Sequence, residues 1–404
     1  MVLPKRHKSV TALQRSDPIA QHYPAGTPVG KQEHPMTLNT HKVLLITTAL
    51  AVSLGGVAQA QTVDMDALIA AAKAEGTLTT IALPHDWCNY GAVIAGFKAK
   101  YGLEVNELNP NAGSADELEA IKANKDNTGP QAPDVIDVGL SFGPAAKADG
   151  LIQPYKVSTW DSIPDSAKDA EGYWYGDYYG VLAMAVNKDV ITDASPTSFA
   201  DLKDPKYAAM VAIPGDPRTG NSSMMSVYAM GLAANGGKGG ADAATAGIAF
   251  LKDLKASGNF VDVGGSAQNF AQGTTPIMMD WDYNILAMRD SLAGNPPMDV
   301  VIPSDGVIAG VYVQAISAYA PHPNAAKLWM EYLYSDEGQL GWLSGYCHPI
   351  RFNDMVARGV IPAEMMAKLP PADNYAKAVF PSLEEQGAAK TVVADTWAVE
   401  MGAN

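Results

Sequence analysis

Apolar residues along the chain alternate between the spacing of short strands and that of amphipathic helices. The first such elements are expected, in chain order, at residues 63–75 (helix), 78–83 (strand), 92–100 (helix), 103–108 (strand), 115–124 (helix) and 134–139 (strand). Gly76 directly follows the first helix and is a typical C-terminal stop. Because strands and helices alternate, we expect an α/β fold with parallel, doubly wound sheets and helices on both faces.

The alternation continues through the second half of the chain. Further strands are expected at residues 181–186, 211–214, 276–279, 300–303 and 307–317, and helices near 224, at 246–256, at 325–334 and beyond the segment around Cys347, with a break at Pro370-Pro371. The glycine-rich residues 234–244 are predicted to form a flexible surface loop. With 404 residues the chain is long enough for two domains. We therefore predict one lobe from residues 61–180, a second from 181–305, and a return to the first in 306–404.

The first sixty residues differ from the rest of the chain. Residues 1–35 are polar and aperiodic, which predicts disorder or a start codon placed too early. Residues 36–60 contain His41-Lys42, an apolar run and a small-residue end at Ala58-Gln59-Ala60, the pattern of a cleaved secretory signal peptide. The alternative is a membrane anchor, but the apolar run is shorter than the roughly 18 to 20 residues that a span needs.

The charge of the exported part argues against two classes of partner. Removing residues 1–60 takes away six of the 28 basic and two of the 43 acidic residues, which leaves 22 basic and 41 acidic residues and a net charge near −19. Such a chain does not bind nucleic acid or an anionic membrane by charge attraction. It is compatible with cationic ligands, although solubility explains the charge equally well.

Two cysteines, Cys88 and Cys347, remain after residue 60. An even number in an oxidising compartment favours one disulfide, and two buried thiols are the alternative. Neither cysteine has a partner at metal-ligand spacing, so no zinc site, other metal site or cofactor is expected.

Acidic and aromatic residues gather at two places where a strand gives way to a helix. Residues 85–91 and 280–284 carry them, as Asp86, Trp87, Asn89 and Tyr90 in the first and Asp280, Trp281, Asp282 and Tyr283 in the second. Asp280 and Asp282 share a face if that stretch is extended. Carboxylates beside aromatic rings attract an ammonium group by charge and by cation–π contacts of about 0.5–2 kcal/mol each.

Three other segments are candidates for ligand contact. Residues 215–223, which include Thr219, Asn221 and Ser222, present small residues at a helix start, where free N–H groups can hold an anion; an ordinary capped helix is the alternative. Ser141 is more typical of a helix cap than of a ligand contact. Residues 172–180, with Tyr178, have clustered aromatics typical of a recognition surface.

Catalytic motifs are missing from the sequence. Paired carboxylates are compatible with a secreted glycosidase, but there is no nucleophile elbow, P-loop, dinucleotide fingerprint or H-E-x-x-H motif. Binding therefore fits better than catalysis, and a secreted hydrolase is the less favoured class.

From about residue 63 the chain resembles the extracellular solute-binding proteins of bacterial ABC importers, with a two-lobed type II fold, and within them the spermidine/putrescine-like branch. The segments that carry the resemblance are residues 86–91, 279–284, 302–306, 309–314, 320–329 and 334–339. The resemblance implies a periplasmic monomer that closes two lobes on a small solute and delivers it to permease subunits.

The resemblance and the two acidic loops together suggest a polyamine-like, amine-bearing solute. The expected ligand-binding residues are Asp86, Trp87, Asn89, Tyr90, Ser141, Tyr178, Thr219, Asn221, Ser222, Asp280, Trp281, Asp282, Tyr283 and Tyr312. The three aspartates would bind the amine, with Trp87, Tyr90, Trp281 and Tyr283 as walls. Thr219, Asn221 and Ser222 would hold an anionic end. The alternative ligands are an aminoalkylphosphonate, another phosphorylated or anionic compound, or ferric ion.

Overall fold

The computed structural model describes residues 63–369 and 377–402. The predicted signal peptide, residues 1–35 and the Pro370-Pro371 break lie outside them. The ten strands of the described residues are β1 (Thr77–Ile81), β2 (Glu104–Leu108), β3 (Val135–Gly139), β4 (Ile152–Gln153), β5 (Tyr175–Asn187), β6 (Val211–Ala212), β7 (Ile277–Trp281), β8 (Met298–Val301), β9 (Ala309–Ser317) and β10 (His348–Pro349).

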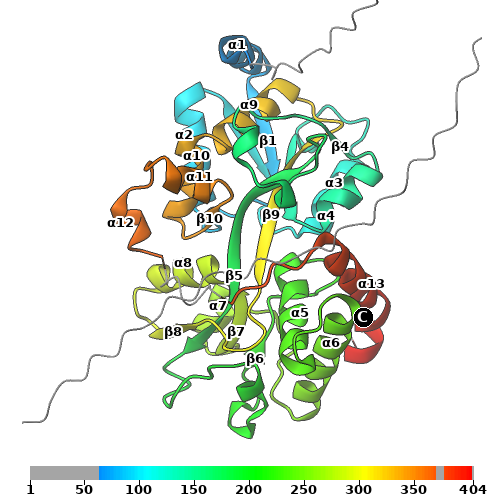
Figure 1. Cartoon of the computed structure of the whole chain (residues 1–404), viewed down its shortest axis with the longest axis vertical. Coiled ribbons are helices and arrows are strands. Elements are labelled where there is room, and N and C mark those ends of the chain that lie inside the picture. The colour runs from blue at the N-terminus through cyan, green and yellow to red at the C-terminus, as the bar shows by residue number, and fades with distance from the viewer. Residues whose placement is uncertain (1–62, 370–376, 403–404) are drawn as a thin grey trace, which may run out of the picture. The chain divides into compact units, whose positions relative to one another are not determined.

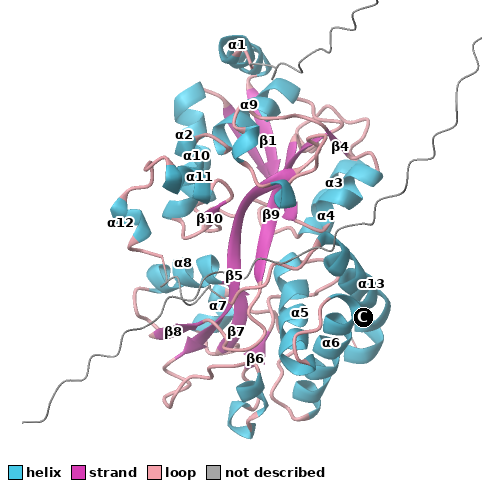
Figure 2. Cartoon of the chain, in the orientation of Figure 1, coloured by secondary structure: helices cyan, strands magenta, loops and turns pink. Residues whose placement is uncertain are grey.

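Helices connect these strands (Figure 2). In the same residues they are α1 (Met65–Glu75), α2 (Tyr90–Tyr101), α3 (Ser114–Ala123), α4 (Phe142–Ala148), α5 (Asn221–Asn235), α6 (Gly240–Ala256), α7 (Ala267–Ala271), α8 (Asp282–Leu292), α9 (Pro323–Leu333), α10 (Asp336–Ser344), α11 (Phe352–Ala357), α12 (Ala363–Met366) and α13 (Leu383–Met401). Single 3₁₀ turns cover Trp160–Ser162, Asp165–Ala167, Ala200–Lys203 and Pro205–Tyr207.

Most predicted elements are confirmed, and the glycine-rich loop is the main exception. The first helix ends at Gly76, which adopts the left-handed conformation that glycine allows. Residues 240–244 belong to α6 instead of a loop. Gly247 of α6 lies against the Val227 carbonyl of α5, and Gly231 lies against Ala243, so these glycines let the two helices pack closely. That packing favours helix where the local composition favours a loop.

The sheets mix parallel and antiparallel pairs. β1 pairs with β2 and β6 with β7 in parallel, as the alternation of strands and helices predicts. The larger sheet has the order β3-β9-β5-β7-β6, and its β3–β9, β5–β9 and β5–β7 pairs are antiparallel. The expectation of parallel sheets throughout was therefore wrong for these strands, because β5 and β9 run in opposite directions.

The long strands β5 and β9 run side by side through the structure (Figure 1). The first half of β5 pairs with β9 and β10, and the second half pairs with β7 and β8. Gly180 of β5 faces Gly310 of β9 across the ladder. The Tyr283 ring lies against Gly180 and the Trp281 ring against Gly310, so a side chain at either glycine would displace an aromatic ring.

Helices pack in groups around these strands. α9 contacts α1, α2 and β9, whereas the C-terminal α13 packs along α6 and also touches α5 (Figure 1). None of the helices in the described part of the chain is both long and apolar enough to cross a bilayer.

The aromatic stretch 172–180 is mostly core, contrary to the expectation of an exposed recognition surface. Trp174, Tyr175 and Tyr178 are buried, and Tyr173 and Tyr179 are half-buried. Tyr175 packs on Tyr334, whose hydroxyl donates to the Tyr175 carbonyl at 2.8 Å. Tertiary contacts such as that of Tyr175 with Tyr334 thus bury aromatic rings that were predicted to be exposed.

The predicted disulfide between Cys88 and Cys347 is present. It joins the loop after β1 to the segment between α10 and β10, and both residues are buried. The bond closes a loop with a sequence separation of 259 residues.

Removing the disulfide should lower stability without abolishing the fold. Because a cross-link over so long a loop restricts the unfolded chain, we expect Cys88→Ala/Cys347→Ala to lose about 2–4 kcal/mol of unfolding free energy. Urea unfolding of the wild type, with and without reductant, and of the double variant measures this loss. Reductant should leave the variant's curve unchanged, and two reactive thiols in the non-reduced, unfolded wild type would contradict the bond.

Candidate functional site

A cavity of about 400 Å³ lies where the loop after β1 meets the first turns of α3 and α5, β7 and α8. Its size is in the range of small-molecule sites. The charged residues that line it are all acidic, namely Asp86, Glu117, Asp137 and Asp280. Aromatic, polar and apolar side chains complete the lining, among them Trp87, Tyr178, Tyr312, Ser114, Asn221, Ser222, Asn284, Met278, Ile285, Met288 and Leu292.

In the loop after β1, Asp86 and Trp87 line the cavity, whereas the following residues Asn89 and Tyr90 do not. Cys88 and Asn89 have left-handed φ values of 48° and 62°, and Tyr90 begins α2. The Asn89 amide donates to the Gly341 carbonyl at 3.1 Å, and Tyr90 is fully buried. Asn89 and Tyr90 therefore do not line the cavity, because they anchor the loop to the core.

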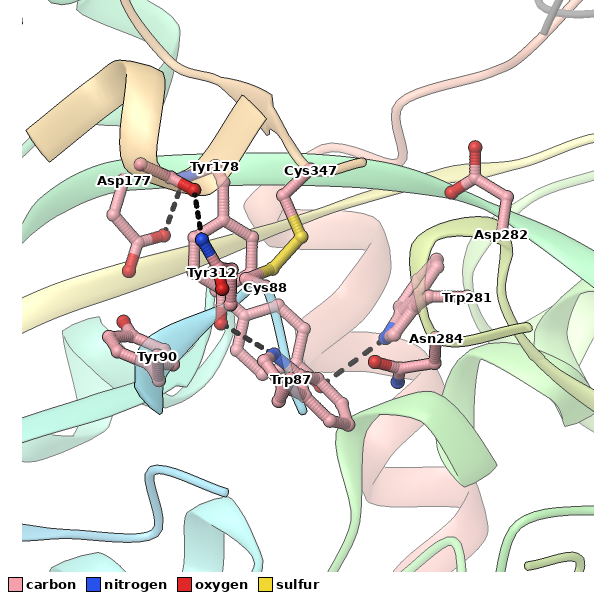
Figure 3. The surroundings of a disulfide bond; sticks show 12 residues. Trp87, Cys88, Tyr90, Asp177, Tyr178, Trp281, Asp282, Asn284, Tyr312 and Cys347 are labelled. Carbon is pink, nitrogen blue, oxygen red and sulfur yellow. Dashed lines mark hydrogen bonds between the residues drawn. A yellow bond between two sulfur atoms is a disulfide. The ribbon is translucent and has the colours of Figure 1, made fainter. Parts of the chain in front are cut away.

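A chain of hydrogen bonds extends from Trp87 into the core, and Figure 3 shows its first bond, between Trp87 and Tyr178. The Trp87 indole N–H donates to the Tyr178 hydroxyl at 2.7 Å, which in turn donates to Oδ2 of Asp137 at 2.8 Å. The Tyr90 hydroxyl donates to the same oxygen at 2.7 Å. The Trp87 ring also packs edge-on against Tyr283 and Tyr312, with 5.5 Å between ring centroids in each pair.

The two aspartates around Trp281 do not share a face, contrary to our expectation. Asp280 ends β7 and lines the cavity, where its carboxylate accepts from the Trp281 N–H at 2.8 Å and from the Asn284 amide at 3.2 Å. Asp282 begins α8, is fully buried, and accepts from the Val181 N–H at 2.9 Å. The helix starts one residue after Trp281, so the period-2 alternation of side chains ends there.

Trp281 and Tyr283 lie behind the cavity lining. Both are fully buried, and the Trp281 indole donates to the Tyr312 hydroxyl at 3.3 Å (Figure 3). Tyr312 itself lines the cavity and stacks on Tyr178 at 5.5 Å. The two aromatics of the β7–α8 segment therefore position the lining side chains.

The 215–223 loop contributes only its last residues. Asn221 and Ser222 begin α5 and line the cavity, and the N-cap Gly220 supplies no side-chain cap. Thr219 does not line it: its hydroxyl donates to the Asp216 carbonyl at 3.3 Å, and its own carbonyl accepts from the Ala115 N–H at 3.4 Å. Arg218 is held by an ion pair with Asp216.

Ser141 lies outside the cavity lining. It occupies the N-cap position of α4, but its side chain makes no capping hydrogen bond. Its hydroxyl is buried and has no partner among the described residues, so the capping role was wrong.

Sequence reasoning missed two acids of the lining, Glu117 and Asp137. Asp137 lies in the middle of β3, a strand in which every residue is buried, and Glu117 is a buried residue in the first turn of α3. The Glu117 carboxylate accepts from the Asp137 N–H at 2.9 Å. The sequence feature that could have identified Asp137 is an acidic residue inside an apolar strand, because ionisable residues are rarely buried without a specific role.

Desolvation raises the pKa of two lining carboxyls, Asp280 and Asp137. The pKa of Asp280 rises to about 7, mainly through desolvation, with hydrogen bonds from Trp281 and Asn284 acting in the opposite direction. The negative charges of Asp282 and Asp86 raise it further. Desolvation likewise raises the pKa of Asp137 to about 6, against the hydrogen bonds from Tyr90 and Tyr178.

Two neighbours of Asp137 are affected in the same way. Burial, reinforced by the charge of Asp137, raises the pKa values of Asp177 and Glu117 well above their usual range. In the described part of the chain, no three His, Cys, Asp or Glu side chains form a group that could hold a metal ion.

The sequence matches the family "Bacterial extracellular solute-binding protein" over residues 131–382. A Haemophilus influenzae relative, named only as an uncharacterized protein, is 27% identical over 262 residues, which cover 62% of this chain and 70% of that protein.

Solved structures of binding proteins share the fold. The periplasmic binding protein AfuA from Actinobacillus pleuropneumoniae, with fructose-6-phosphate bound, aligns with a TM-score of 0.63 at 20% identity and covers 81% of this chain and 98% of its own. Iron-bound HitA from Pseudomonas aeruginosa aligns with a TM-score of 0.59 at 20% identity, and the alignment covers 79% of this chain and 98% of HitA. The Atu4243–GABA receptor aligns with a TM-score of 0.59 at 16% identity, and the alignment covers 80% of this chain and 97% of the receptor. These likenesses support the α/β periplasmic binding protein fold.

The raised pKa values predict that the ligand-free protein loses stability as the pH rises. Asp280 and Asp137 keep their protons in the folded state up to about pH 7 and 6, whereas the unfolded chain releases them near pH 4. The folded state thus binds more protons between these values, and the free energy of unfolding falls through the window by at most about 1.4 kcal/mol per pH unit and group.

Urea unfolding at pH 4.5, 6 and 7.5 measures this decline. Asp280→Asn should make it shallower, whereas the exposed Asp126→Asn should leave it unchanged. Parallel curves for the wild type and Asp280→Asn would show that Asp280 titrates normally.

Proposed function

We propose, on the premise that this chain belongs to the family of bacterial extracellular solute-binding proteins, that it captures a small amine-bearing solute in the periplasm. As a member of a binding-protein family that serves ABC importers, it binds its ligand without converting it and passes it to permease subunits. The family match leaves the nature of the solute open. The proposal for an amine rests on the cavity.

The observation that carries the proposal is the charge of the cavity lining. It contains four carboxyl groups and, within the described residues, no Lys, Arg or His side chain. No basic side chain of the described lining pairs with these carboxyls, so a ligand that brings positive charge supplies the counter-charge that they lack. A purely anionic ligand would meet repulsion from those of the four groups that are ionised.

The aromatic lining supports the same ligand class. Trp87, Tyr178 and Tyr312 surround the acidic groups, and the rings of Trp87 and Tyr312 meet edge to face. Ring faces attract ammonium groups by about 0.5–2 kcal/mol per contact. Met278, Ile285, Met288 and Leu292 form an apolar part of the lining, which suits an alkyl chain.

The arrangement of the chain supports a lobe-closing mechanism. We assign residues 61–180 and the return from residue 306 to one lobe and residues 181–305 to the other. Within that return, α13 is an exception, because its packing on α5 and α6 supports placing it with the second lobe. Asp86 and Trp87 then belong to one lobe and Asp280 and Tyr283 to the other, so closure brings both sides onto the ligand.

A second candidate is an amine that also carries an anionic group, such as an aminoalkylphosphonate. The α5 helix starts at the cavity without a side-chain cap, so the N–H groups of Asn221 and Ser222 are suited to an anion. A polyamine of the spermidine/putrescine type needs only the acids.

A thermal-shift screen separates these candidates. We expect putrescine or spermidine to raise the melting temperature, because a ligand at a hundred times its Kd stabilises the native state by about 2.7 kcal/mol. 2-Aminoethylphosphonate and 4-aminobutyrate, which carry both an amine and an anionic group, test the second candidate. Fructose 6-phosphate and ferric citrate test ligands without an amine. Stabilisation by these two alone would overturn the proposal, and turnover of any bound compound would point to a hydrolase.

Asp280→Asn should weaken binding of the responding amine roughly 10- to 100-fold, because a hydrogen bond to a charged group contributes about 1.5–3 kcal/mol. Isothermal titration calorimetry measures the change, with Asp126→Asn as the control. Unchanged affinity in Asp280→Asn would exclude this carboxylate from the binding site.

A further inference from the structure

We propose that Asp137, a residue of β3 beneath Trp87, binds the ammonium group of the ligand and determines the specificity of the cavity for amines. This inference rests on the proposed function and deepens it. Side chains from α2, α3 and β5 bond to Asp137, and Gln314 of β9 bonds to one of them; the proposed ligand contact is the other carboxylate oxygen, Oδ1.

The hydrogen-bond directions around Asp137 are fixed by donors that cannot accept. The indole N–H of Trp87 only donates, so the Tyr178 hydroxyl uses its own proton toward Oδ2 of Asp137. The Gln314 amide donates to the Tyr90 hydroxyl at 2.9 Å, and Tyr90 donates to the same Oδ2. Oδ2 thus receives two protons from phenols, an arrangement that favours a carboxylate.

The other oxygen is left without a partner. Oδ1 of Asp137 is buried and has no hydrogen-bond partner among the described residues, while the residue is 6% exposed and lines the cavity. A buried carboxylate oxygen without a donor costs free energy. A ligand N–H group supplies the missing donor, and an ammonium group also supplies the missing charge.

The surroundings of Asp137 disfavour a negatively charged ligand group and favour a positively charged one. Within residues 63–369 and 377–402, the ionisable groups that interact electrostatically with Asp137 are acids or phenols, namely Glu117, Asp177, Tyr90, Tyr178, Tyr283, Tyr312 and Tyr334. Several carboxyls at short range do not all ionise. An arriving ammonium group therefore favours the ionised form of Asp137, so binding releases a proton and strengthens as the pH rises from 5 to 7.

The test compares Asp137→Asn with Asp177→Asn. Both residues are buried acids of the same cluster, but Asp177 does not line the cavity. The probes are putrescine, spermidine and 4-aminobutyrate, each titrated calorimetrically at pH 5, 6 and 7. Circular dichroism and melting temperature confirm that each variant is folded.

We expect Asp137→Asn to weaken binding at least about 30-fold, because it leaves the ammonium group without its buried partner. Asp177→Asn, which keeps the Asp137 carboxylate at the cavity, should have a clearly smaller effect. Titration in buffers of different ionisation enthalpy should detect a released proton in the wild type that is absent in Asp137→Asn. If Asp137→Asn does not fold, Tyr178→Phe replaces it: losing one donor to Oδ2 should lower the affinity and alter its pH dependence.

The outcomes separate the two proposals. Unchanged affinity and proton release in Asp137→Asn, with Asp280→Asn impaired, overturn the role of Asp137 and leave the amine function standing. An unchanged Tyr178→Phe overturns it in the same way. Failure of all three amines to bind the wild type overturns both.

Discussion

The antiparallel pairing of β5 with β9 is the interaction on which the rest of the structure depends. Gly180 and Gly310 face each other in this ladder, and their lack of side chains admits the rings of Tyr283 and Trp281. Those rings support Trp87 and Tyr312 at the cavity. The same two strands carry Tyr178 and Gln314, which complete the hydrogen bonds around Asp137. Backbone pairing and aromatic packing at one crossing therefore position side chains from five separate segments.

The described lining of the cavity contains acidic side chains but no basic side chain to pair with them. Glu117 and Asp137 are buried, and desolvation raises the pKa of Asp137 and Asp280. Such an arrangement lowers the stability of the ligand-free protein, as functional sites often do. A cationic ligand removes the same cost on binding, so the destabilised acids and the proposed specificity have one physical origin. The disulfide holds the Trp87 loop to the α10–β10 segment, which limits the conformational freedom that this loop loses when ligand binds.

Local patterns in the sequence predicted much of this site. The acid and aromatic residues after β1 and in β7 point to Asp86, Trp87 and Asp280, and all three line the cavity. The same reasoning failed at Asp282, because it could not locate the residue at which strand becomes helix. It also overlooked Asp137, whose importance depends on Tyr90 and Tyr178, distant in sequence. The roles of these residues in binding stay predictions.

Hydrophobic periodicity and glycine stops in the sequence by themselves determined the α/β class and most element positions, because each reflects a local constraint. Cysteine parity favoured the Cys88–Cys347 bond over two buried thiols. The tertiary structure alone decided the antiparallel centre of the sheet, the burial of Trp174 and Tyr178, and which acids share the cavity. These depend on contacts between segments more than a hundred residues apart, such as Tyr90 with Gln314. Neither periodicity nor propensity within one segment carries that information.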